Sequence, residues 1–157
     1  MKIQLVNVLK KVSLLCAILL VTVVASAQGQ TLGSRVTAQI PFEFSIGDKK
    51  LPSGKYSVGR LRQNSDDVVI SVEDQGGRSR ALRTSIPVVD ANITAKAKLV
   101  FHRYGDQYFL YQVWPAGATT GRQFLKSRSE RELRENLAAN TSVGKTPETV
   151  TITGVLQ

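Results

Sequence analysis

The residues able to carry acid–base or nucleophilic chemistry are few in this chain. His102 is the only histidine, and histidine is the side chain whose unperturbed pKa lies near neutrality. A hydrolytic triad would place it beside a serine and an aspartate, and no spacing in the sequence predicts that arrangement. We interpret His102, expected beside Phe109 on a strand, as a packed or hydrogen-bonded structural residue. A small hydrolase that uses His102 is kept as an alternative.

One further nucleophile motif stands in the wrong context. Ser142 and Lys145 form the Ser-x-x-Lys pattern of penicillin-recognising enzymes. That pattern works when a helix brings the lysine beside the serine, and Gly144 and Pro147 argue against a helix here. The partner motif Lys-Thr-Gly is missing too, because Thr146 is followed by proline. We therefore expect no catalytic residue in this segment.

Metal ligands and cofactor motifs are equally scarce. A single histidine argues against a transition-metal site, and Cys16, the only cysteine, lies in the N-terminal apolar segment. The acidic pairs Asp66-Asp67 and Glu73-Asp74 lack the alternating oxygen spacing of a calcium-binding loop. The sequence therefore predicts no metal ion, no cofactor and no catalytic constellation.

Arginines gather in one region of the chain. They are Arg60, Arg62, Arg78, Arg80 and Arg83. On paired strands they would form a basic face able to bind phosphates or carboxylates, for example those of an anionic envelope polymer or of another protein. The alternative is a solvated face balanced by the acidic residues of the same span. Nucleic acid is not an expected partner, because the aromatic residues look like core residues.

The N-terminal segment has the pattern of a secretory signal peptide. Lysines in the first eleven residues precede residues 12–25, an apolar run without a charge. Ala25 to Ala27 supply the small-x-small pattern of a cleavage site, which predicts cleavage between Ala27 and Gln28. The alternative is an uncleaved anchor, but a span needs about 20 apolar residues and this run is shorter. We expect export to the periplasm or the extracellular space, without a membrane span after cleavage.

The mature chain is expected to hold a flexible tail (28–34) and one β-rich domain (35–157). Loss of residues 1–27 removes three lysines, which leaves 18 basic and 12 acidic residues and a net charge of +6. It also removes the only cysteine. An exported domain without disulfides must rest on its hydrophobic core.

The segment from Ile93 to Trp114 predicts a hairpin that the other elements surround. Its first arm alternates apolar with mostly polar residues, the period of a strand. Gly105-Asp106 predicts a two-residue turn, because glycine readily adopts a positive φ. One predicted face holds the pairs Arg103–Tyr108, Phe101–Leu110 and Ala97–Trp114. The other holds His102–Phe109, Val100–Tyr111 and Lys98–Val113.

Further strands are expected at residues 36–46 (with a bend at Pro41), 55–61, 68–72, 79–86 and 149–153. The only helix is expected within 127–140, where Ser127 and Glu130 fit a capping box. Leu133 and Leu137 form a narrow apolar stripe, which predicts that this helix packs across the outer side of the hairpin. The fold class is therefore mainly β: an antiparallel β-sandwich or barrel of seven or eight short strands with one late amphipathic helix.

Several segments are similar to those of a known group of proteins. They are residues 40–47 (IPFEFSIG), 51–56 (LPSGKY), 100–110 (VFHRYGDQYFL) and 126–133 (KSRSEREL). Together they resemble a group of small, signal-bearing exported proteins found in many copies in acidobacterial genomes. The resemblance implies export and one compact domain, and it carries over no activity and no catalytic residue.

The expected function follows from what is abundant and what is scarce. Strand and core patterns are abundant, and residues for catalysis are scarce. This favours an exported, non-catalytic β-domain that serves as an envelope or extracellular binding or structural module. The alternatives are a small-ligand-binding barrel of the lipocalin type and the small hydrolase with His102. An outer-membrane barrel is not favoured, because the strands are short and lack two aromatic girdles.

Overall fold

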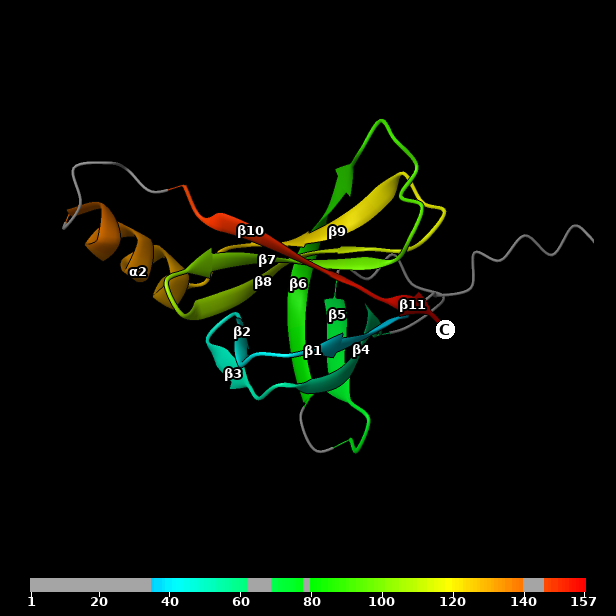
Figure 1. Ribbon diagram of the computed structural model, residues 1–157, viewed down its shortest axis with the longest axis horizontal. Helices are drawn as coiled ribbons and strands as arrows, with labels where there is room; N and C mark the ends of the chain where they lie inside the picture. The colour runs from blue at the N-terminus through cyan, green and yellow to red at the C-terminus, as the bar shows by residue number, and fades with distance from the viewer. Residues whose placement is uncertain (1–34, 62–68, 78–79, 140–145) are drawn as a thin grey trace, which may run out of the picture. The chain divides into compact units, whose positions relative to one another are not determined.

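Eleven strands and one late helix make up the described part of the chain, residues 35–61, 69–77, 80–139 and 146–157 of a computed structural model (Figure 1). Residues Gly33–Gln157 form one compact unit. The elements are β1 (Val36–Ile40), β2 (Phe44–Ile46), β3 (Lys49–Leu51), β4 (Gly54–Arg60), β5 (Val69–Asp74), β6 (Arg80–Val89), β7 (Lys98–Tyr104), β8 (Gln107–Trp114), β9 (Thr120–Phe124), α2 (Arg128–Ala139), β10 (Glu148–Thr153) and β11 (Val155–Leu156). The mainly β fold with one late helix is confirmed.

Some sequence predictions lie outside the described residues. They are the signal segment with its cleavage site at Ala27 and Gln28, the tail 28–34, Asp66-Asp67 and the Ser-x-x-Lys segment. Within the described part, strands are more numerous than the seven or eight expected. The stretch 36–46 divides at Pro41 into β1 and β2, and β9 is absent from the expected strands. The two- and three-residue strands β11 and β3 are too short to show an alternating pattern.

The strands form one mostly antiparallel sheet in the order β10-β7-β8-β9-β6-β5-β4-β1-β11. The short β2 pairs with β3 and adds to β8 through a parallel bridge. Strand β6 joins two halves of the sheet, because Arg80 to Thr84 line up with the residues of β5 and Ser85 to Val89 with those of β9. The sheet is not closed, so the architecture is a sandwich or an open barrel.

Gly154 lies where the last strand passes from one end of this order to the other. Strands β10 and β11 flank it, and they pair with β7 and β1 respectively. Its N–H donates to the Ala97 carbonyl at 2.7 Å. A Cβ here would lie 2.7 Å from Cγ1 of Val36 and 2.9 Å from the carbonyl oxygen of Thr37. The crossing therefore needs a residue without a side chain.

The β7–β8 hairpin confirms the predicted turn and the pairing next to it. Gly105 has a φ of 61°, and the two strands align Arg103 with Tyr108 and Phe101 with Leu110. His102 pairs with Phe109 in the same register.

Beyond Phe101 the predicted register is wrong, because a β-bulge inserts one residue. Val100 pairs with Gln112, which leaves Tyr111 as the extra residue. Every pair further from the turn is shifted by one, so the predicted pairs Ala97–Trp114, Val100–Tyr111 and Lys98–Val113 are not formed. Since neighbouring strand residues point to opposite faces, the shift also exchanges faces. Val113 joins the hydrophobic core, and Trp114 pairs with Lys98 on the other side.

The space on the inner face of the sheet is filled by side chains. Phe44 is 1% exposed and makes edge-to-face contacts with Tyr56 and Phe101, with ring centroids 5.1 and 5.6 Å apart. Phe42 packs edge-on against Phe101 and stacks on Tyr108. The edge-to-face contacts are a favourable aromatic geometry. Aliphatic side chains from strands of both halves complete one continuous core.

Candidate functional site

A buried cluster of three polar side chains lies between β7 and the first turn of α2. The Nδ1 atom of His102 is 2.9 Å from Oε1 of Glu130, and the Tyr104 hydroxyl donates to the same oxygen at 3.2 Å. The three residues are 7%, 5% and 5% exposed in the order His102, Glu130, Tyr104. An ionised carboxylate only accepts hydrogen bonds, so Nδ1 carries the proton in this arrangement.

Burial and the neighbouring carboxylate change the pKa of the Tyr104 phenol. Its burial raises its pKa, and the Glu130 carboxylate raises it further, to about 12. Both effects disfavour the phenolate, because burial penalises charge and the neighbouring carboxylate repels a second negative charge. Tyr104 is thus a hydrogen-bond donor throughout the physiological range.

His102 is packed and hydrogen-bonded. The Tyr111 ring stacks on its imidazole with centroids 3.8 Å apart, and Nδ1 is engaged by Glu130. The nearby Ser127 hydroxyl accepts from the Glu130 backbone N–H at 3.1 Å and shares a hydrogen bond with Ser129 at 2.9 Å. These contacts direct Ser127 and Ser129 to the start of the helix. The geometry suits fixing a helix to a sheet.

The start of α2 is held by polar contacts on both sides. Ser127 forms the predicted cap, while Glu130 points inward to the cluster instead of returning to the cap residue. From the β2–β3 turn, Asp48 accepts from the Ser129 hydroxyl at 3.1 Å and from its N–H at 3.4 Å. These hydrogen bonds, with the positive charge of Arg83, lower the pKa of Asp48. A carboxylate here also faces the positive end of the helix dipole.

The rest of α2 does not pack across the hairpin as predicted. Glu130 is the buried residue of this helix, and Leu133 and Leu137 are only half-buried. In Figure 1 the helix lies beyond the turn of the β7–β8 hairpin. The outer face of the hairpin is covered instead by its own aromatic residues, such as Tyr111 on His102. Leu133 and Leu137 are thus only partly covered, and Leu137 borders a cleft that Tyr104 also lines.

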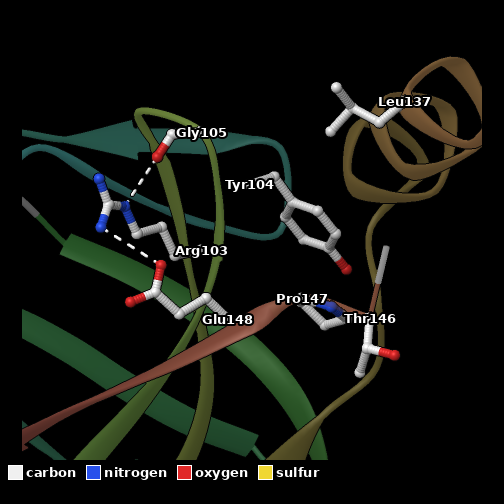
Figure 2. A pocket seen from close by; sticks show the side chains of 7 residues that line it. All are labelled: Arg103, Tyr104, Gly105, Leu137, Thr146, Pro147 and Glu148. Atoms are coloured by element: carbon white, nitrogen blue, oxygen red, sulfur yellow. Dashed lines mark hydrogen bonds and ion pairs between the residues drawn. The ribbon is translucent and has the colours of Figure 1, made fainter. Parts of the chain in front are cut away.

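A cleft of about 390 Å³ adjoins this cluster. Figure 2 shows the Tyr104 ring between Leu137 on one side and Thr146 and Pro147 on the other. Arg103 also lines the cleft, where its guanidinium is 3.3 Å from the Glu148 carboxylate and donates to the Gly105 carbonyl at 2.8 Å (Figure 2). Arg103, the basic side chain among the residues that line the cleft, is thus already paired with Glu148. The cleft lies outside the packed core.

The structure separates the arginines that were expected on one face. Arg62 and Arg78 lie outside the described residues. Arg60 and Arg83 both pair with Ile70 in register, so they share a face of the sheet. Arg80, three residues before Arg83, projects from the opposite face. Of these, Arg80 and Arg83 have carboxylates nearby, with the pairs Arg80–Glu73 at 3.3 Å and Arg83–Asp48 at 3.9 Å.

Another arginine, Arg122, is half-buried on β9. Burial and the positive charge of Arg60 lower the pKa of Arg122. Sequence reasoning missed this residue because β9 was not recognised as a strand. Arg122 and Phe124 stand two residues apart, and this spacing would have been the sequence signal for a strand.

Among the residues described above, no three His, Cys, Asp or Glu side chains gather as metal ligands, and no helix is long and apolar enough to cross a membrane. Protein-family models, curated proteins and solved structures were compared with the chain, and none matches.

Proposed function

We propose that this protein is an exported, non-catalytic β-domain that serves as a binding module of the envelope or the extracellular space. It binds an anionic envelope polymer through its surface. The observation that carries this proposal is the filled interior of the sheet. Phe44, Tyr56 and Phe101 occupy the space in which a lipocalin-type barrel holds its ligand. Binding is therefore assigned to the outside of the domain.

The surroundings of His102 support a non-catalytic role. Its ring is buried and stacked, and its Nδ1 atom is committed to Glu130. A general base needs hydrogen-bond reach to a substrate proton. The cleft beside Tyr104 is lined by neither His102 nor Glu130. A hydrolase built on His102 would need this cluster to open.

The charge of the chain supports an anionic partner. With residues 1–27 removed, 18 basic residues face 12 acidic ones. Export rests on the leader pattern with cleavage between Ala27 and Gln28, and on the resemblance to exported acidobacterial proteins. Sequencing the N-terminus of the secreted protein should yield Gln28 first. An intact N-terminus in the membrane fraction would contradict export with cleavage.

The direct test is retention of the purified protein on an immobilised poly(glycerol phosphate), with an uncharged dextran column as control. We expect retention at low ionic strength that falls steeply with added salt, because ion pairs with a polymer are screened by salt. Elution in the void volume of both columns would contradict the proposal. Release of a bound apolar molecule from the unfolded protein would instead favour the small-ligand barrel.

A further inference from the structure

A second cleft, of about 340 Å³, lies on the outer face of the sheet. Its floor is formed by β7 and β10, where Lys98 pairs with Thr153 and Val100 pairs with Thr151. Residues paired across antiparallel strands share a face, and Leu99, between Lys98 and Val100, belongs to the core on the opposite face. The connection between β6 and β7 forms the wall of the cleft.

The wall is held in place by hydrogen bonds. The Asp90 N–H donates to the Thr119 carbonyl at 2.9 Å, and the Thr94 N–H donates to the Ala118 carbonyl at 3.0 Å. These bonds tie the connection to the loop before β9. Within the wall, the Asp90 carboxylate accepts from the Asn92 N–H at 3.0 Å. The cleft is therefore preformed, which lowers the entropy that a ligand loses by ordering the chain.

The floor carries a positive charge at a fixed place. Lys98 is half-buried, and its Nζ atom lies 5.5 Å from the centroid of the Trp114 ring, within the reach of a cation–π contact. The Trp114 indole is held in turn, because its N–H donates to Gln112 at 3.0 Å. Lys96 is exposed and adds a second ammonium group to the lining, which also holds the carboxylate of Asp90.

The other groups in the cleft suit a ligand that carries hydroxyls. Thr151 and Thr153 are exposed, and their hydroxyls both donate and accept hydrogen bonds. The Asp90 carboxylate has further lone pairs that accept from a ligand hydroxyl. Ile93, which also lines the cleft, is 67% exposed and offers an apolar contact to carbon atoms. The volume is near the lower end of ligand sites, about 300–1,000 Å³, and fits one small unit.

We propose that this cleft binds one anionic polyol unit, a small hydroxylated group that carries a single acidic function. The acidic function lies at Lys96 and Lys98, whose ammonium groups attract it, and the hydroxyls lie at Thr151, Thr153 and Asp90. Lysine is a compact point charge without the planar fork of arginine, so it accepts either a phosphate or a carboxylate. The inference rests on the proposed function, because it names the unit of the envelope polymer that the domain recognises.

The test uses two anionic probes, glycerol 1-phosphate and glucuronate, with glycerol and glucose as their uncharged counterparts. Each is titrated at low ionic strength into the purified protein while NMR follows the indole N–H of Trp114, the single tryptophan, and the amides of Thr151 and Thr153. We expect saturable shifts with at least one anion and at least tenfold weaker binding of its counterpart. The anion that binds better identifies the acidic function. No saturable shift with either anion, or equal binding of the counterpart, would overturn the site.

Matched variants separate the cleft from net charge. Lys96→Gln and Lys55→Gln each remove one exposed charge, and Lys55 lies on β4, outside the cleft. The first should weaken binding about tenfold, because a hydrogen bond to a charged group is lost, and the second less than twofold. Thr153→Val removes a hydroxyl at nearly constant shape and should weaken binding about threefold.

Thr149→Val is the control for the hydroxyl. Thr149 is exposed on the same strand and face as Thr153 but does not line the cleft, so its replacement should leave binding unchanged. Equal effects of the two variants within either pair, lysine or threonine, would overturn the site. All four side chains are exposed, so the comparison depends on no core residue.

The column with immobilised poly(glycerol phosphate) distinguishes this inference from the proposed function. Undiminished retention of the Lys96→Gln/Thr153→Val double variant would overturn the site while the proposed function stands. Saturable binding of an anionic probe that is lost in the variants, in a protein that the polymer does not retain, would support the site and contradict the proposed function.

Discussion

Replacing Glu130 by alanine should strongly destabilise the protein. The carboxylate accepts hydrogen bonds from His102 and Tyr104, and all three side chains are buried. Its removal leaves two buried donors without an acceptor, at about 1–3 kcal/mol each. Breaking a buried ionic or charge-assisted pair costs about 3–5 kcal/mol in other proteins. We therefore expect a loss of about 3–5 kcal/mol in the free energy of unfolding, a large part of the stability of a domain this size.

The assay is thermal unfolding followed by far-UV circular dichroism and by Trp114 fluorescence. At about 4 °C per kcal/mol for a domain of this length, Glu130→Ala should lower the midpoint by about 12–20 °C. Glu130→Gln keeps one acceptor oxygen and should lower it less. Glu135→Ala is the matched control, because Glu135 is exposed on the same helix. Equal midpoints for Glu130→Ala and Glu135→Ala would refute the assigned role of the cluster.

The same variants have a spectroscopic readout. The pKa of Tyr104 is raised to about 12 by burial and by the Glu130 carboxylate. The folded protein thus favours the neutral phenol. The resulting stability is fully present below the ordinary tyrosine pKa near 10, and it is lost as the pH rises through about 12. In Glu130→Gln the ultraviolet titration of Tyr104 should move to lower pH. An unchanged titration would mean that the carboxylate does not govern this phenol.

Two further predictions concern the backbone crossing and the start of the helix. Gly154→Ala should cost about 1–3 kcal/mol of stability, because its Cβ would lie 2.7 and 2.9 Å from atoms of β1. Gly54→Ala is the control, because its Cβ would meet its nearest atom at 3.5 Å. Chemical denaturation of both variants measures the difference in their free energies of unfolding. The pKa of Asp48 is lowered by its hydrogen bonds to Ser129, so its contribution to stability is present above the ordinary value of 3.8 and is lost as the pH falls through the lower folded pKa. Asp48→Asn should therefore flatten the acid limb of a stability–pH curve, and parallel curves for wild type and variant would count against this role.

Local features of the chain determined much of the fold. The alternation of apolar residues before Gly105 predicted a strand from Ile93, of which Lys98 to Tyr104 form β7. The glycine predicted the turn with its positive φ. Ser127 was recognisable as a helix cap because its acceptor reaches a backbone N–H three residues away. Each of these depends on groups within a few residues of one another, which is why composition and spacing reveal them.

The bulge in the hairpin shows where local reasoning stops. Nothing in the sequence around Tyr111 distinguishes an extra, unpaired residue from a regular one. Its presence exchanges the faces of Val113 and Trp114. In the structure Trp114 lies so close to Gly121 of β9 that a Cβ there would be 2.6 Å from its ring. The register is thus tied to packing against a neighbouring strand, and the hairpin sequence alone does not contain that information.

The polar sites were decided by tertiary structure alone. By its spacing Glu130 reads as part of a capping box on a helix surface, and it is buried because the sheet brings His102 and Tyr104 against the first turn of α2. Asp90 and Thr153 line one cleft although they lie far apart in the sequence. Periodicity tells which face of a strand a residue occupies. Which side chains line one cleft depends on the curvature of the sheet and on the registers of several strands together, and only the folded chain determines these.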